Sequence, residues 1–196
     1  MEADDPARSV ARALILVPTR ELAEQVGAHL RNLLVYCGQD IVCANLAAGT
    51  SNHLRFVDRH RFISEKTEIL LRTLLADRPD IVIATPSRAL QFLQSKVCQL
   101  VALTFHSTTE LPRKSLSLTS LESLVIDEAD LILSYGHDED IRQIFRGSFL
   151  PKVFQSFLMS ATMTEDVEML KGLVLRNPVS LVPSHEQHVV IDRRLY

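Results

Sequence analysis

The stretch Leu124-Val125-Ile126-Asp127-Glu128 joins three apolar residues directly to two carboxylates. A short, continuous apolar run rich in Val, Ile and Leu is typical of a strand that is buried on both faces of a parallel sheet. In an open sheet of this kind, ligands bind beyond the carboxyl ends of the strands. We therefore expect Asp127 and Glu128 to lie at the mouth of a sheet rather than on a solvated helix face.

Similar apolar runs recur along the chain. They predict strands at residues 14–17, 41–44, 81–84, 124–126 and 157–159, with a weaker candidate at 179–182. Apolar residues at helical spacing predict helices at residues 21–35, 65–75, 87–93, 139–145 and 165–174. This alternation predicts an α/β fold, in which an open parallel sheet carries helices on both faces through right-handed crossovers.

Length and composition indicate one domain without a strong overall charge. The 196 residues are 46% hydrophobic, which is enough for a single buried core. The formal net charge is -3, so any contact with nucleic acid must be local. We expect a disordered lead-in at residues 1–9, one domain over residues 10–184 with a surface insertion near 99–120, and a C-terminal segment at 185–196.

The sequence also argues against several other classes of protein. The cysteines Cys37, Cys43 and Cys98 form no C-x-x-C pair, which suits buried thiols in a reducing compartment. No apolar run approaches the roughly 20 residues of a membrane span, so we expect a soluble intracellular protein that does not contact a membrane. The sequence His-Glu-Gln-His at 185–188 has the wrong spacing for a zinc helix, and we expect no structural metal.

Four of the predicted strands are followed at once by polar clusters. Thr19 and Thr85 could each cap the next helix, and Pro86 suits a first helical position, which is a purely structural explanation. The functional explanation is that the N–H groups of a helix N-terminus attract a phosphate, to which Arg20 and Arg88 add a full charge. Two such ends on one edge could hold successive phosphates of a strand without reading its bases. The clusters are Pro18-Thr19-Arg20, Thr85-Pro86-Ser87-Arg88, Asp127-Glu128-Ala129-Asp130 and Ser160-Ala161-Thr162.

The carboxylates also have two explanations. Asp127 could hold Mg²⁺ through its water shell while the metal bridges nucleotide phosphates, and Glu128 could orient or deprotonate the attacking water. Alternatively, the pair could occupy the N-terminus of the next helix, where negative charge is favourable. Asp130 could cap locally, or it could reach Ser160 and Thr162 on the adjacent strand end.

Together, these clusters resemble motifs Ia, Ib, II and III of the DEAD-box RNA helicases. The resemblance runs from about residue 11 to residue 182 and implies a RecA-like domain, the first of two in that family. The surrounding residues are most similar to a nucleolar subgroup linked to the assembly of the large ribosomal subunit. The matching sequences are Pro-Thr-Arg-Glu-Leu-Ala at 18–23, Thr-Pro-Ser-Arg at 85–88, Asp-Glu-Ala-Asp at 127–130 and Ser-Ala-Thr at 160–162, in the family's order.

The resemblance implies an ATP-dependent enzyme that remodels RNA in the nucleus and nucleolus, with ATP and Mg²⁺ as cofactors. Its partners would be RNA, bound through the RNA backbone independently of base sequence, and pre-ribosomal proteins. Asp127 would organise Mg²⁺ through water, and Glu128 would be the catalytic base. Asp130, Ser160 and Thr162 would couple hydrolysis to strand separation. The residues implied for RNA binding are Pro18, Thr19, Arg20, Gly49, Thr85, Pro86 and Arg88.

The chain departs from the family pattern at three places. The Gly-Gly turn after the second strand is Ala48-Gly49, and the glycine of motif Ib is Ser87, so close approach of an RNA backbone is in doubt at Ala48 and Ser87. Gly49 remains a candidate. The larger departure is the phosphate-binding loop, because none of the six glycines is followed by a lysine.

In this fold the strand that carries the phosphate-binding loop lies inside the sheet. We therefore expect neighbouring strands to have unpaired edges and uncovered apolar flanks, and the chain to be marginally stable and inactive alone. The upstream adenine-reading motif and the second RecA-like domain with its arginine finger are not in these 196 residues either. Two hypotheses follow: an incomplete N-terminal catalytic domain of an ATP-dependent RNA helicase, and a non-catalytic truncated module that binds RNA or a protein partner.

Overall fold

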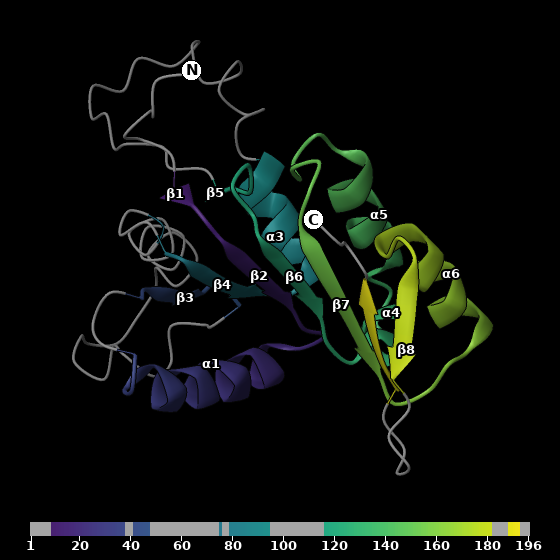
Figure 1. Cartoon of the computed structure of the whole chain (residues 1–196), viewed down its shortest axis with the longest axis horizontal. Helices are drawn as coiled ribbons and strands as arrows, with labels where there is room; N and C mark the ends of the chain where they lie inside the picture. Colours follow the sequence, from purple (N-terminus) through teal and green to yellow (C-terminus); the bar gives the residue numbers. More distant parts are fainter. Residues whose placement is uncertain are drawn as a thin grey trace, which may run out of the picture.

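A seven-stranded sheet organises the part of the chain that the structure describes (Figure 1). The structure is a computed structural model, and it describes residues 9–37, 41–47, 75, 79–94, 116–181 and 188–192. The elements in these ranges are β1 (Ser9–Val10), β2 (Ala13–Leu16), α1 (Arg20–Leu34), β3 (Cys43–Asn45), β4 (Ile81–Ala84), α3 (Pro86–Gln94), β5 (Leu116–Ser117), β6 (Ser123–Ile126), α4 (Ala129–Ser134), α5 (Asp138–Arg146), β7 (Gln155–Ser160), α6 (Glu165–Val174), β8 (Pro178–Leu181) and β9 (His188–Asp192).

The strand order in the large sheet is β3-β4-β2-β6-β7-β9-β8. The first five strands are parallel, whereas β9 runs antiparallel to both β7 and β8. β1 and β5 form a separate parallel pair. The predicted open parallel sheet is therefore confirmed for five strands, and an antiparallel pair extends it at one side.

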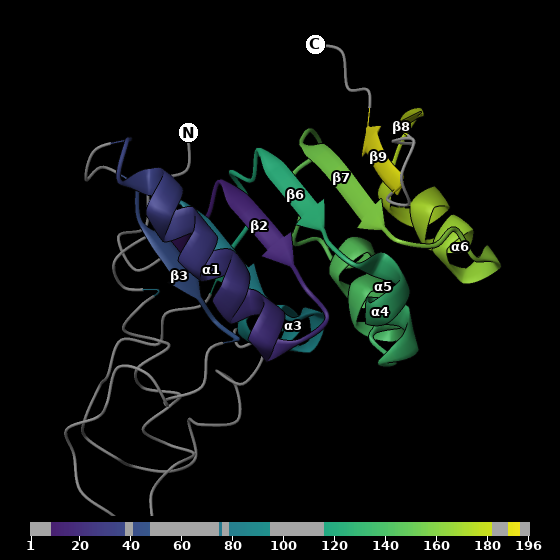
Figure 2. The same cartoon turned by 90° about the horizontal axis from the view of Figure 1, so that it is seen from below.

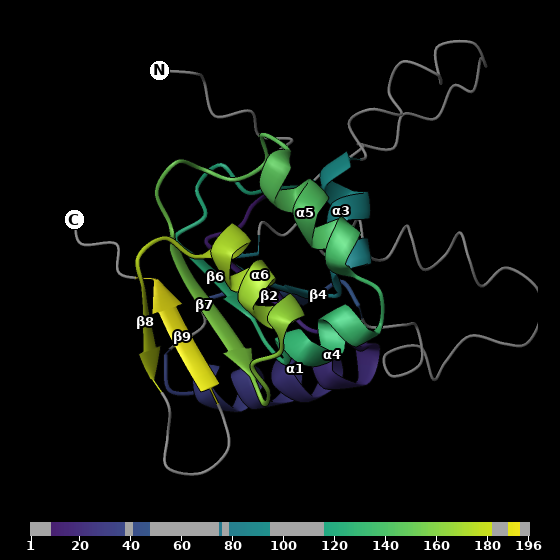
Figure 3. The same cartoon turned by 90° about the vertical axis from the view of Figure 1, so that its right-hand side faces the viewer.

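Helices cover both faces of this sheet, as Figures 2 and 3 show. On one face, Val26 and Leu30 of α1 pack against a cluster that includes Val17 and Ile83. The other face carries α3, α4, α5 and α6 over a larger core, to which Leu14 belongs. Because successive side chains of a strand point to opposite faces, the continuous apolar runs of the sequence supply both cores at once.

The helices that follow the strands begin in two different ways. The Thr19 hydroxyl accepts a 3.2 Å hydrogen bond from the backbone N–H of Leu22, so the predicted cap of α1 is confirmed. Thr85 directly precedes α3, and its carbonyl accepts a 2.9 Å hydrogen bond from the N–H of Ala89, whereas a cap by its hydroxyl stays a prediction. Pro86 is the first residue of α3, and its fixed backbone suits the first helical turn.

The outer edge of β7 is occupied. β9 pairs with it, and Phe157 lies opposite Ile191, so the prediction that this edge would be unpaired is wrong. The domain boundary expected at residue 184 falls between β8 and β9, which are paired strands. On the α1 face, however, Val125, Phe157 and Met159 are only half-buried. These side chains are half-buried rather than exposed, so the prediction of an uncovered apolar flank on β6 and β7 stays a prediction.

Three local predictions have different outcomes in the structure. Residues 116–118 are buried and include β5, although they fall within the expected surface insertion. Cys37 is exposed and Cys43 is half-buried, so the prediction of buried thiols is wrong for Cys37, which lies beyond the end of α1. The lead-in at 1–8, the helix expected at 65–74, Gly49, most of the insertion and Cys98 lie outside the described residues.

Candidate functional site

The polar clusters lie at one edge because the parallel strands end in register. Leu16 of β2 pairs with Ala84 of β4 and with Ile126 of β6, which pairs with Leu158 of β7. The ladder continues one residue further, since the N–H of Asp127 donates to the carbonyl of Leu16 at 2.9 Å. The residues that follow these four strands therefore share one edge of the sheet.

Asp127 is half-buried at the end of β6, and its Oδ1 accepts a 2.9 Å hydrogen bond from the N–H of Glu128. Burial raises the pKa of Asp127, and the hydrogen bond from Glu128 opposes this shift. The pKa of Glu128 is also raised, first by burial and then by the charges of Asp127 and Asp130. The two carboxylates thus hold a proton more readily than ordinary acids.

Glu128 has a left-handed backbone, with φ 50 and ψ 55. A residue with a Cβ rarely adopts this conformation, which costs about 1 kcal/mol or more. Glu128 is the residue before α4, so this turn lets the chain leave β6 and enter the helix at once. The acids therefore do lie at a helix N-terminus, as the structural explanation required, but they also lie at the carboxyl edge of the sheet.

Asp130, Ser160 and Thr162 form a closed hydrogen-bonded group. The backbone N–H of Asp130 donates to Oγ of Ser160 at 3.3 Å, and that hydroxyl donates to the carbonyl of Thr162 at 2.8 Å. Oγ1 of Thr162 donates to Oδ2 of Asp130 at 2.9 Å. Of the two explanations for Asp130, the structure supports the reach to Ser160 and Thr162, and its Oδ1 also accepts from the N–H of Leu131.

The residues expected to contact RNA divide into buried and accessible ones. Pro18 and Pro86 are buried, so their rings shape the turns after β2 and β4 rather than presenting a surface. Arg20 is exposed at the start of α1, where its Nε lies 3.4 Å from Oε1 of Glu24. Arg88 is half-buried at the start of α3. Gly49 cannot be placed in this site, because it lies outside the described residues.

Two residues that hold Arg88 were not predicted from the sequence. The guanidinium donates to Oε1 of Gln91 at 2.6 Å and lies 5.6 Å from the centre of the Phe92 ring. Both partners are within one helical turn of Arg88, so their spacing in a predicted helix was a usable signal. Asn45 was also missed, and its Oδ1 accepts from the N–H of Ala47 in the turn after β3.

The donor set suits Mg²⁺ held through water. Asp127 offers Oδ2, which accepts no hydrogen bond in the described part of the chain, and Mg²⁺ prefers carboxylate oxygens and its own waters. Among the described residues, no group of three or more histidine, cysteine, aspartate or glutamate side chains could hold a metal ion. A cation here would therefore take most of its ligands from water and from a bound phosphate.

Comparison with known proteins gives a consistent result. The family model described as DEAD/DEAH box helicase matches residues 3–170. Proteins named ATP-dependent RNA helicase dbp9 are 42% identical, both in Aspergillus niger over 92% of this chain and in Cryptococcus neoformans over 88% of it. The chain spans only 23% and 22% of those two relatives.

The fold has a solved counterpart in a DEAD box protein from Methanococcus jannaschii. The TM-score is 0.58 at 23% identity, and the match covers 83% of this chain and 34% of the other. No helix in the described ranges is both long and apolar enough to cross a membrane.

The family match extends over most of the chain and includes each of the four polar clusters at the sheet edge. The chain therefore belongs to the DEAD/DEAH box helicase family.

Proposed function

We propose that this chain supplies the catalytic carboxylates and part of the RNA-binding edge of an ATP-dependent RNA helicase. The observation that carries the proposal is the shared register of β2, β4, β6 and β7, which places all four polar clusters on one edge. Family membership favours this function over that of a non-catalytic module. The acids, the hydroxyl residues and two helix N-termini are then within one continuous site.

In this proposal Asp127 binds Mg²⁺ through water, and Glu128 orients and deprotonates the attacking water. Asp127 would thereby hold a cation that supplies positive charge against the phosphates of ATP. The raised pKa of Glu128 suits a general base, since proton transfer is most efficient when the pKa of the base approaches the working pH. The left-handed backbone at Glu128 fixes the direction in which this carboxylate leaves the chain.

We assign the RNA backbone to the N-termini of α1 and α3. Arg20 and Arg88 both stand in the first turn of a helix, where N–H groups and positive charge favour a phosphate. Contacts of this kind hold a strand without reading its sequence. Asp130 and Thr162 join the acidic site to the end of β7, which offers a route by which hydrolysis and RNA binding affect each other.

The proposed setting is ribosome assembly in the nucleolus, with pre-ribosomal proteins as partners. It rests on the subgroup resemblance of the sequences around Asp127 and Ser160 and on the similarity to proteins named dbp9. The phosphate-binding loop is not among the 196 residues, so the chain by itself should not bind Mg²⁺-ATP tightly.

Calorimetry of Mg²⁺-ATP binding tests the nucleotide part of the proposal. The chain is compared with the same chain extended upstream by a family phosphate-binding loop, with Asp127→Asn and Asp138→Asn introduced into the extended form. We expect binding only by the extended chain, a loss of magnesium-dependent affinity in Asp127→Asn, and normal binding in Asp138→Asn. If the extended chain binds ATP equally well without Mg²⁺, and Asp127→Asn leaves that binding unchanged, the proposed role of Asp127 is contradicted.

RNA binding is tested with a labelled single strand by fluorescence anisotropy. Arg20→Ala and Arg88→Ala should each weaken binding several-fold and lower the slope of log affinity against log salt by roughly one. Arg146→Ala, at the exposed end of α5 and outside the residues assigned to RNA, is the control that should leave both quantities unchanged. Equal losses in all three variants would indicate general charge attraction and not the proposed edge.

A further inference from the structure

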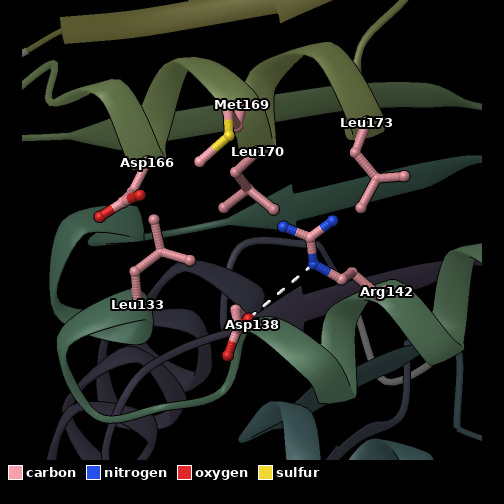
Figure 4. A pocket seen from close by; sticks show the side chains of 7 residues that line it. All are labelled: Leu133, Asp138, Arg142, Asp166, Met169, Leu170 and Leu173. Carbon is pink, nitrogen blue, oxygen red and sulfur yellow. Dashed lines mark ion pairs between the residues drawn. The ribbon is translucent and has the colours of Figure 1, made fainter.

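A groove runs between α5 and α6 (Figure 4). Its volume is about 170 Å³, which is comparable to the roughly 150 Å³ that accommodates a benzene-sized group. Four apolar side chains line it, and Leu170 among them is buried while Met169 is 58% exposed. An exposed methionine beside one buried and two half-buried leucines is an adaptable apolar surface. The lining residues are Leu133, Asp138, Arg142, Asp166, Met169, Leu170 and Leu173.

The charged side chains that line this groove are Asp138, Asp166 and Arg142, so acidic groups outnumber basic ones. The first turns of α5 and α6 each carry three acidic residues, and one from each helix, Asp138 and Asp166, lines the groove. The ion pair between Asp138 and Arg142 is long, at 3.9 Å, and exposed, so it contributes little. Within the described ranges the Asp166 carboxylate has neither an ion pair nor a hydrogen bond.

We propose that this groove docks a basic segment of a partner protein, with one large apolar side chain between lysines or arginines. The apolar side chain fits the space above Leu170, and its basic neighbours meet Asp138 and Asp166. RNA does not suit the groove, because its phosphates would face the same excess of acidic groups. Complementary charge around an apolar anchor is the usual arrangement of a specific protein contact.

The position of the groove gives this contact a consequence. Leu133 belongs to α4, the helix whose first turn contains Asp130. Asp166 belongs to the first turn of α6, which begins shortly after Thr162 in the chain. The bond from Thr162 to Asp130 joins α4 to the loop that precedes α6. A partner seated in the groove would therefore touch α4, which carries Asp130, and α6, the helix that follows the loop of Thr162. This inference does not depend on the proposed catalytic roles, since it concerns a different surface.

The test uses the full chain and a labelled peptide in which leucine and phenylalanine stand between lysine pairs, with a matched peptide that has glutamate in place of lysine. Asp166→Lys should weaken binding of the lysine peptide by about tenfold, and Met169→Ser by about fivefold, at physiological ionic strength. Glu165→Lys is the control, because it makes the same charge change one residue away and outside the groove lining. It should change the affinity by less than about twofold. All three positions are exposed, so the variants should fold.

Several results would overturn the proposal. Equal binding of the lysine and glutamate peptides would exclude charge recognition, and equal losses in Asp166→Lys and Glu165→Lys would exclude a defined site. Displacement of the peptide by a short RNA would assign the groove to nucleic acid instead. Sedimentation tests whether the chain self-associates. If it does and Met169→Ser abolishes the self-association, a second copy of the chain covers the groove.

Discussion

Oγ1 of Thr162 donates a 2.9 Å hydrogen bond to Oδ2 of Asp130, and this bond joins the loop after β7 to the first turn of α4. The two residues are far apart in the chain, so their contact depends on the pairing of β6 with β7. A carboxylate acceptor makes a hydrogen bond stronger than a neutral one, while exposure of Thr162 to water weakens it.

Thr162→Val should therefore lower the free energy of unfolding by about 1 kcal/mol. Valine keeps the shape of threonine and removes only the donor. The measurement is urea unfolding of the single variants Thr162→Val and Asp130→Ala and of the double variant, which together give the coupling energy of the pair. A coupling energy near zero would show that the bond does not contribute to stability.

Asp127 should make the folded chain less stable at neutral pH. Its pKa is raised by burial, so between the unfolded and folded pKa values the folded state binds more protons than the unfolded state. The free energy of unfolding then rises as the pH falls through the raised pKa, and the penalty is fully present above it. Asp127→Asn, whose amide oxygen can still accept from Glu128, should raise the melting temperature at pH 7.

The gain from Asp127→Asn should shrink as the pH is lowered, because the native carboxyl becomes neutral too. Thermal unfolding across a pH series measures this convergence. Asp138→Asn removes a charge of the same sign from the exposed start of α5 and should not show a gain with this pH profile. A gain in Asp127→Asn that stays constant down to acidic pH would point to a cause other than the buried charge.

The left-handed backbone of Glu128 should make asparagine better than glutamine at this position. Both Glu128→Asn and Glu128→Gln remove the charge, but asparagine tolerates positive φ far better. The asparagine variant should therefore be the more stable of the two by about 0.5–1 kcal/mol in chemical unfolding. If the two variants have the same stability, the conformation at Glu128 carries no appreciable strain.

The hydroxyl of Ser156 is fully buried on β7 and has no hydrogen-bond partner among the described residues. Burial of an unpaired polar group is unfavourable, so Ser156→Ala should stabilise the chain by about 1 kcal/mol, or roughly 2–4 °C in melting temperature. Ser117→Ala is the matched control, since the buried Ser117 hydroxyl lies 3.1 Å from that of Thr119. It should destabilise the chain, and gains of equal size in both variants would argue against the explanation.

The central sheet and its polar edge could be predicted because their signals are local. A continuous apolar run identifies a strand buried on both faces, and the residue that follows it must lie at the carboxyl edge. For that reason the neighbourhood of Asp127 and Glu128 followed from the sequence. The left-handed backbone of Glu128 could not be predicted, because glutamate has no preference for it and the short passage from β6 to α4 imposes it.

Contacts between distant segments were less predictable. The sequence Val189-Val190-Ile191 is an apolar β-branched run of the same kind, so a strand there was within reach. The antiparallel pairing of this strand with β7 could not be predicted, because pairing with a distant edge leaves no local signature in the sequence. The buried state of Pro18 and Pro86 likewise depends on elements that pack over them.

The position of β9 between β7 and β8 leads to a last prediction. A strand with neighbours on both sides uses its backbone N–H groups in the sheet, and Val190 lies opposite Leu158 on one side and Ser180 on the other. Val190→Pro removes one such N–H and fixes the backbone, so it should destabilise the chain by about 2 kcal/mol or more. Val190→Thr keeps both the N–H and the branched Cβ and serves as the control.

Hydrogen exchange locates the effect of Val190→Pro. Amide protons of β7 should exchange faster than in the threonine variant, whereas those of β2 and β4, which lie beyond β6 from the substituted strand, should keep their protection. This contrast follows from the strand order, because a loosened β9 uncovers the edge of β7 first. Equal stability of the proline and threonine variants, with unchanged exchange in β7, would mean that β9 does not hold this edge in solution.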